Sequence, residues 1–135
     1  MGKLADIKVE GSVLYNYINP IDPTDADIEE YSAELLHCVR QLDHKVTVII
    51  ETSQAKVLKA EHRIAMGNIL KNNKQLILNK VNALVYVVAH PLIQFVINGI
   101  FLVSKPPVKY HVTTDIKRAI KWIDKKYGVL DTDHQ

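Results

Sequence analysis

The stretch ALVYVVAHPLIQFVINGIFLV, residues 83–103, decides the fold of this chain. Its first part, Ala83–Ala89, is a short run of apolar and mostly β-branched residues, which predicts a strand buried on both faces. Pro91 then stands at a favourable first helical position, and the apolar residues after it predict a helix that ends near Val103. The length approaches that of a bilayer span, but the interspersed polar residues favour a buried strand and a buried helix over a membrane segment.

The strand pattern recurs on both sides of this stretch. Val46–Ile50 is a second continuous apolar run, and Val108–Val112 alternates apolar with polar residues. Both patterns predict strands. Two further alternating segments, residues 7–9 and 13–17, flank Gly11 and predict two strands joined by a tight turn.

Three more helices are predicted from caps and from apolar residues at helical spacing. Thr24 and Asp27 form a capping-box pattern ahead of an apolar stripe from Ile28 to Leu42. A second helix is expected over about Leu58–Leu78, and the last one is expected to begin at Thr114 as its N-cap.

The order of these elements predicts the fold class. Strands that alternate with helices imply parallel pairing and right-handed crossovers, whereas two tightly joined strands pair antiparallel. We therefore expect an α/β fold with a mixed five-stranded sheet, in which the first strand is antiparallel and the centre is parallel, and about four helices. The 135 residues are expected to form a single domain, 1–135, with a core over about residues 7–127.

Composition and charge argue against several classes of protein. With 47% hydrophobic and 24% charged residues, the chain is typical of soluble globular proteins. Its net charge of +2 and its lack of interleaved aromatic and basic residues predict no nucleic-acid partner. Residues 1–10 lack the apolar run of a signal peptide, and Cys38 is the only cysteine. We therefore expect a cytoplasmic protein without stable membrane insertion.

Sequence motifs for catalysis and for metal or cofactor binding are lacking. The six histidines form no HxxxH pair, and the sequence has no CxxC, glycine-rich phosphate loop or GxSxG. We therefore expect no metal ion, no cofactor and no catalytic residue. His62 and Asn73 fall on the apolar face of the second helix. We interpret them as hydrogen-bonded residues at the edge of the core, and a ligand pocket is the alternative.

Polar residues follow the predicted parallel strands. Glu51, Thr52 and Ser53 end one strand, His90 follows the next, and Thr113 follows the last. Because the carboxyl ends of parallel strands share one edge of a sheet, these residues are candidates for binding a ligand or partner. His62 is a further candidate, through the alternative of a ligand pocket on the second helix. A serine, a histidine and an acid together also suggest a hydrolase. No oxyanion loop accompanies them, so capping and loop hydrogen bonds are the expected role.

The helix after Pro91 is apolar on nearly all of its sides. A helix packed on a sheet buries about half of its circumference, so part of this apolar surface is expected to need another cover. We predict that Phe95, Ile97 and Phe101 contribute to a self-association interface, and that the protein is a homodimer.

Two segments of the second half carry a family resemblance. The run YVVAHPL, residues 86–92, resembles the YVV-x-NPL segment of the SpoIIAA-like branch of the bacterial STAS-like domains, with His90 in place of Asn. Residues 111–123 resemble the HVF ending of the same family, with Thr113 in place of Phe. The resemblance spans about Val9–Tyr127 and lies mostly at core positions, so it implies the fold more strongly than an activity. This family is related in shape to the lipid-carrying CRAL-TRIO fold.

The resemblance implies a non-enzymatic regulatory or protein-interaction module. In sporulation anti-anti-sigma factors, an acid-Ser-Ser-Gly turn carries the phosphorylated serine, which corresponds to Ser53 here, and Gln54 stands where that turn has glycine. The alternative function is a carrier or sensor of a small apolar or lipid ligand.

Overall fold

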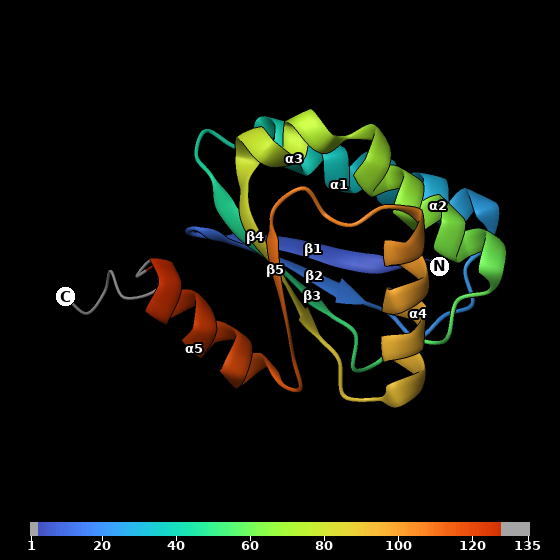
Figure 1. Cartoon of the computed structure of the whole chain (residues 1–135). Helices are drawn as coiled ribbons and strands as arrows, with labels where there is room; N and C mark the ends of the chain where they lie inside the picture. The colour runs from blue at the N-terminus through green and yellow to red at the C-terminus, as the bar shows by residue number, and fades with distance from the viewer. Residues whose placement is uncertain (1–2, 128–135) are drawn as a thin grey trace.

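The computed structural model describes residues 3–127, and its framework is one five-stranded sheet (Figure 1). The order of the strands across the sheet is their order in the sequence. The first two strands pair antiparallel, and every other neighbouring pair is parallel. The predicted α/β fold with a mixed sheet is therefore confirmed. The strands are β1 (Ala5–Glu10), β2 (Val13–Ile18), β3 (Val46–Glu51), β4 (Val81–Val87) and β5 (Lys109–Thr113).

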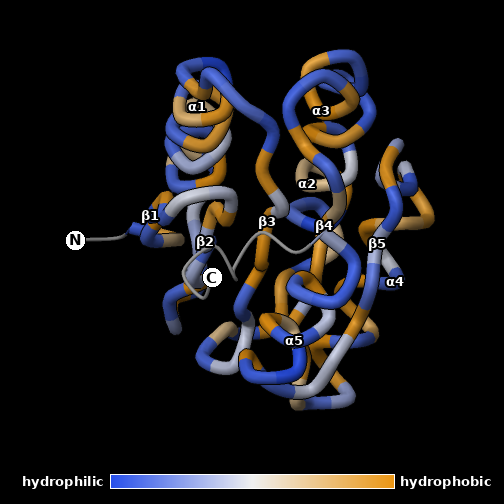
Figure 2. The backbone as a smooth tube through the Cα atoms, turned by 90° about the vertical axis from the view of Figure 1, so that its left-hand side faces the viewer, coloured by the Kyte–Doolittle hydropathy of each residue, from blue (hydrophilic) through white to orange (hydrophobic). Residues whose placement is uncertain are grey.

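Helices cover both faces of this sheet unequally. A sequential order of parallel strands with right-handed crossovers forces all connecting helices onto the same face. Figures 1 and 2 show this arrangement, with α1 to α4 in a layer on one face and α5 alone on the other. The helices are α1 (Asp25–Gln41), α2 (Ala60–Asn72), α3 (Lys74–Lys80), α4 (Pro91–Val103) and α5 (Ile116–Tyr127).

Several local signals act as the sequence predicts. The Thr24 Oγ1 atom accepts a hydrogen bond from the Asp27 amide at 3.1 Å, and Asp27 Oδ2 accepts one from the Thr24 amide at 2.8 Å. This capping box begins α1. Gly11 has a φ of +60° in the turn between β1 and β2, a backbone conformation that favours glycine. Helix α4 begins at Pro91 and ends at Val103, as expected.

Residues 3–127 contain five helices where about four were expected, because the predicted helix over Leu58–Leu78 is two helices. The backbone leaves helical geometry at Asn73, with φ −124° and ψ 27°. There the Asn73 side-chain amide donates to the Ile69 carbonyl at 2.8 Å, and the backbone carbonyl of Asn73 accepts from the Ile77 amide at 3.0 Å. Asparagine competes with a helical backbone in this way, so α2 ends and α3 begins at this residue.

Other boundaries differ from the prediction by one or two residues. Strand β4 begins at Val81 and ends at Val87, so it starts and stops two residues earlier than expected. The cap of the last helix is Asp115 rather than Thr114, because Asp115 Oδ1 accepts from the Arg118 amide at 2.9 Å. The predicted frayed tail, residues 131–135, lies outside the described residues.

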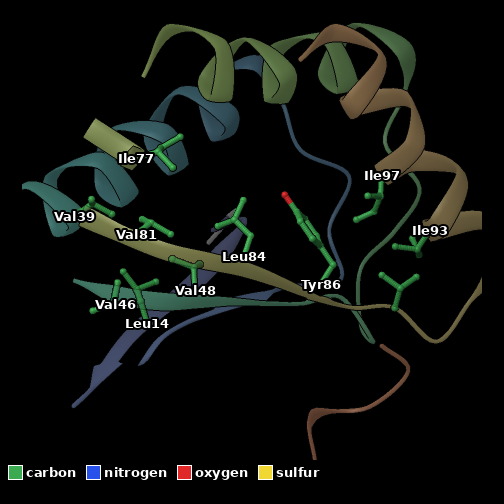
Figure 3. Packing of buried hydrophobic residues seen from close by; sticks show 11 residues of the cluster. Leu14, Val39, Val46, Val48, Ile77, Val81, Leu84, Tyr86, Ile93 and Ile97 are labelled. Carbon is green, nitrogen blue, oxygen red and sulfur yellow. The ribbon is translucent and has the colours of Figure 1, made fainter. Parts of the chain in front are cut away.

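The two largest hydrophobic clusters lie on opposite faces of the sheet, and a third, of Leu4, Ala5, Ile28 and Tyr31, joins the start of β1 to α1. The larger lies between the sheet and the layer of α1 to α4, where Leu84 and Tyr86 rise from β4 toward the helices (Figure 3). The smaller joins α5 to β2, β3 and β4 through Val13, Ile49 and Val85. Cys38 packs beside the larger core, and burial raises the pKa of its thiol, which favours the unreactive protonated form.

Close packing of α2 against α4 depends on Gly67. A Cβ atom at this position would lie 2.4 Å from Val103 Cβ and 2.9 Å from the Ile100 carbonyl oxygen. Overpacking of this kind costs about 1–3 kcal/mol, and alanine's better helix propensity offsets about 1 kcal/mol of it. We expect Gly67→Ala to lower the free energy of unfolding by about 1 kcal/mol in urea titrations followed by circular dichroism. A more stable Gly67→Ala variant would show that the two helices can separate freely.

Candidate functional site

A groove of about 490 Å³ opens where β3 and β4 end. Glu51 is the last residue of β3, and the chain then turns through Thr52 and Ser53 into the loop ahead of α2. On the other wall, His90 precedes the first turn of α4. The structure therefore brings Thr52, Ser53 and His90 to one site, as the strand ends suggest.

Hydrogen bonds within the groove hold its polar side chains in structural roles. Glu51 accepts from both the amide and the hydroxyl of Ser53, at 3.1 and 2.8 Å. Thr52 donates its hydroxyl to the Val87 carbonyl at 2.7 Å and so ties β3 to β4. His90 Nδ1 accepts from the Leu92 amide at 3.1 Å and caps α4. Among the described residues, no hydrogen bond joins Ser53 to His90, so the groove lacks the serine–histidine contact of a hydrolase.

Thr113 and His62 lie away from this groove. Thr113 ends β5, and its carbonyl accepts from the Val88 amide at 2.8 Å. His62 is buried on α2, where its Nε2 atom lies 2.9 Å from Asp25 Oδ1. Both residues therefore serve to hold elements of the fold together.

His62 belongs to a group of three potential metal ligands. Asp25, Glu61 and His62 each offer a ligand atom, and these atoms lie within 4.8 Å of one another. The sequence search missed this group because Asp25 and His62 are 37 positions apart and come from different helices. The bond between the buried imidazole and Asp25 already joins α1 to α2, and it accounts for the position of both side chains.

The predicted interface residues differ in accessibility. Phe95 is 58% exposed, whereas Ile97 is only 3% exposed and belongs to the larger core. Phe101 packs edge-on against Tyr86 and Tyr110, with ring centroids 5.5 and 4.8 Å away. Of the three predicted residues, Phe95 alone is free to meet a partner, because the other two pack within the fold.

A stripe of exposed apolar side chains nevertheless runs along α4. Leu92 is 55% exposed and Leu102 is 88% exposed. With Phe95 and Gly99, they stand at positions i, i+3, i+7 and i+10, which is the spacing of a helix-pairing seam. The Arg63 guanidinium stacks over the Phe95 ring at 5.3 Å and leaves much of the ring open. We call Leu92, Phe95, Gly99 and Leu102 the α4 stripe, and Leu92 also lines the groove.

Two apolar cavities lie between the sheet and the helix layer. The inner cavity, of about 100 Å³, is lined by Asn16, Tyr31, Leu35, Leu84 and neighbouring residues. The outer cavity, of about 110 Å³, lies beside Ile21, Lys56, Ile97 and their neighbours. The two share four lining residues, namely Tyr31, Ile50, Met66 and Tyr86.

The polar groups of the inner cavity are neutral. Figure 3 shows Tyr86 with its hydroxyl directed from β4 toward the helix layer. Burial raises the pKa of Tyr86 and also that of Tyr31, so both phenols are protonated at neutral pH. The Asn16 side-chain amide donates to Tyr31 Oη at 2.6 Å, while Asn16 Oδ1 has no hydrogen-bond partner among residues 3–127. Tyr31 belongs to the predicted apolar stripe from Ile28 to Leu42, and Asn16 lies within the predicted strand 13–17, but no sequence pattern indicates that the two side chains meet.

Comparison with known proteins adds no assignment. No protein-family model matches the sequence, and no curated protein matches it. In residues 3–127, no helix combines the length and the apolar character needed to cross a bilayer.

Proposed function

We propose that this chain is a non-enzymatic, STAS-like protein-interaction module that forms a homodimer through the α4 stripe. The observation that carries the proposal is the exposure of Leu92, Phe95 and Leu102 on one side of a single helix. Large apolar side chains gathered in one patch are typical of interaction surfaces.

A second copy of the chain is the partner that this stripe favours. Helix α4 packs against α2, and Arg63 of α2 lies over part of the stripe. Leu92, Phe95 and Leu102 are nevertheless each more than half exposed, so they are available to a helix from another molecule. The seam spacing repeats along the helix, from Leu92 through Phe95 to Leu102. A two-fold axis across the stripe would place each Phe95 against the partner helix, which is the self-complementary arrangement of a two-fold dimer.

The groove adjoins this proposed interface. Leu92 belongs to both, and the exposed Ser53 lies in the same groove. A change of charge at Ser53 would therefore act next to the dimer contact, in keeping with the regulatory role that the family resemblance implies.

Sedimentation velocity tests the dimer. We expect wild-type protein to be dimeric at micromolar concentration, and Phe95→Glu to raise the dissociation constant at least about a hundredfold, because each two-fold contact would bury two carboxylates in place of two apolar rings. The matched control is Leu78→Glu, which changes an exposed leucine on α3 outside the stripe and should leave the dimer intact. A wild type that stays monomeric at micromolar concentration, or dissociation by both variants alike, would contradict the proposal.

The two cavities support a second candidate function, a carrier or sensor of a small apolar ligand. Cavities between a sheet and its helices, walled by aliphatic and aromatic side chains with few polar groups, are typical of sites for small molecules. This function does not compete with dimer formation, since the cavities and the α4 stripe use different side chains.

A further inference from the structure

We propose that the inner cavity binds a small neutral hydroxyl compound, an alcohol or a phenol, through hydrogen bonds with Asn16 and Tyr31. The proposal rests on the second candidate function and names the chemistry of its ligand.

Asn16 and Tyr31 form a buried pair whose hydrogen-bonding groups are not all satisfied. Asn16 is only 1% exposed, and its amide nitrogen donates to Tyr31 Oη at 2.6 Å. Asn16 Oδ1 is then an acceptor without a partner among residues 3–127, while the second amide N–H of Asn16 and the Tyr31 O–H are donors that this bond does not use. Turning the amide over leaves the same balance, because Tyr31 would donate to the amide oxygen, and both amide N–H groups and the Tyr31 oxygen would be free. The pair therefore offers two donors and one acceptor.

A hydroxyl group is the complement of this pair. It donates one hydrogen bond and accepts another, so one ligand hydroxyl satisfies the free acceptor of the pair and one of its two free donors. An unpaired buried polar group costs about 1–3 kcal/mol, and the rest of the cavity wall is largely apolar. A ligand relieves this cost only if its hydroxyl group reaches Asn16 and Tyr31.

The charge of the cavity excludes ionised ligands. Of the residues that the structure describes, no Asp, Glu, Lys, Arg or His lines the inner cavity, and an isolated charge buried without a partner is strongly disfavoured. Lys56 lines only the outer cavity, and it is exposed there and faces Asp22 at 3.8 Å. A carboxylate or an ammonium group is therefore not expected beside Asn16.

The volumes set the size of the ligand. Cavities of about 150 Å³ in other proteins hold benzene. The inner cavity, of about 100 Å³, is smaller than this, but it shares lining residues with the outer one of about 110 Å³. The flexible Met66 side chain belongs to both walls, so a compact ring of benzene size with one hydroxyl fits the pair when Met66 moves aside.

Phenol and toluene make a direct test, because they have nearly the same shape and only phenol carries a hydroxyl. Binding is followed on the full chain by NMR chemical shifts of residues that line the inner cavity, such as Leu84 and Ile50. We expect wild type to bind phenol about tenfold more tightly than toluene. Asn16→Leu should remove that preference, whereas Asn79→Leu, the same substitution on the exposed side of α3, should keep it. Tyr31→Phe is the second variant, and it should also remove the preference.

The outcomes distinguish failure of the hydroxyl inference from failure of the apolar-ligand function. If phenol and toluene bind the cavity equally in wild type, the hydroxyl inference is wrong and the apolar-ligand function stands. If neither compound shifts the cavity residues, or if the shifts lie only on the surface, both are wrong. A phenol preference that persists in both cavity variants also contradicts the role of Asn16 and Tyr31.

Discussion

Ile123→Ala should lower the free energy of unfolding by about 3–4 kcal/mol, within the range measured for truncation of a fully buried isoleucine. Ile123 is completely buried and packs with Val13, Ile49 and Val85 in the smaller core. In the described part of the chain, α5 is the only helix on that face of the sheet. No second helix can move in to fill the space, so the cavity left by truncation should persist.

Urea unfolding followed by circular dichroism measures this loss. The control is Ile64→Ala, because Ile64 also lies on a helix but is 51% exposed. It should change stability by less than about 0.5 kcal/mol, as is usual for surface sites. Similar losses in the two variants would mean that α5 is not packed against the sheet as described.

The fold could be predicted from the sequence because its decisive signals are local and strong. The apolar run of β4 followed at once by Pro91 defines a strand and the start of a helix without any knowledge of the rest. The break at Asn73 could not be foreseen in the same way. An apolar periodicity continues through it, and only the position of the Asn73 side chain on the Ile69 carbonyl ends the helix.

The candidate site was predictable only where it follows from strand order. The carboxyl ends of parallel strands must share an edge, and this places Ser53 and His90 in one groove. The inner cavity depends instead on a pairing across 15 positions, between Asn16 on β2 and Tyr31 on α1. In the sequence, Asn16 reads as an outward polar residue between Tyr15 and Tyr17. It is buried because β2 lies inside the sheet and is covered on both faces.

The sequence predicted that part of the apolar surface of α4 would be exposed, but not which residues would form that part. An all-round apolar helix indicates that some side chains remain uncovered, whereas the rotation of the helix on the sheet decides which ones. That rotation depends on long-range packing, such as the close approach of α4 to Gly67 of α2 at Val103. It turns Ile97 into the core and Phe95 outward.

The double substitution Asn16→Leu with Tyr31→Phe should raise the free energy of unfolding by about 2 kcal/mol. Replacing both partners of a buried pair removes the unpaired acceptor, whose burial costs about 1–3 kcal/mol. Leucine also fills part of the inner cavity with apolar atoms. Tyr31→Phe alone should instead destabilise the protein by about 1 kcal/mol, because it leaves the Asn16 amide without any partner.

A stabilised double variant that no longer prefers phenol to toluene would indicate that the pair serves binding at the expense of stability, as functional sites often do. Urea titrations of the wild type, the Tyr31→Phe variant and the double variant measure the free energies of unfolding. The test is sharp because the single variant is expected to be less stable than the wild type and the double variant more stable. The contrary result is a double variant less stable than wild type by more than about 1 kcal/mol, a large effect for a near-neutral apolar replacement. It would mean that water or the surrounding chain already satisfies Asn16 and Tyr31, and that the pair is part of the packing rather than a ligand site.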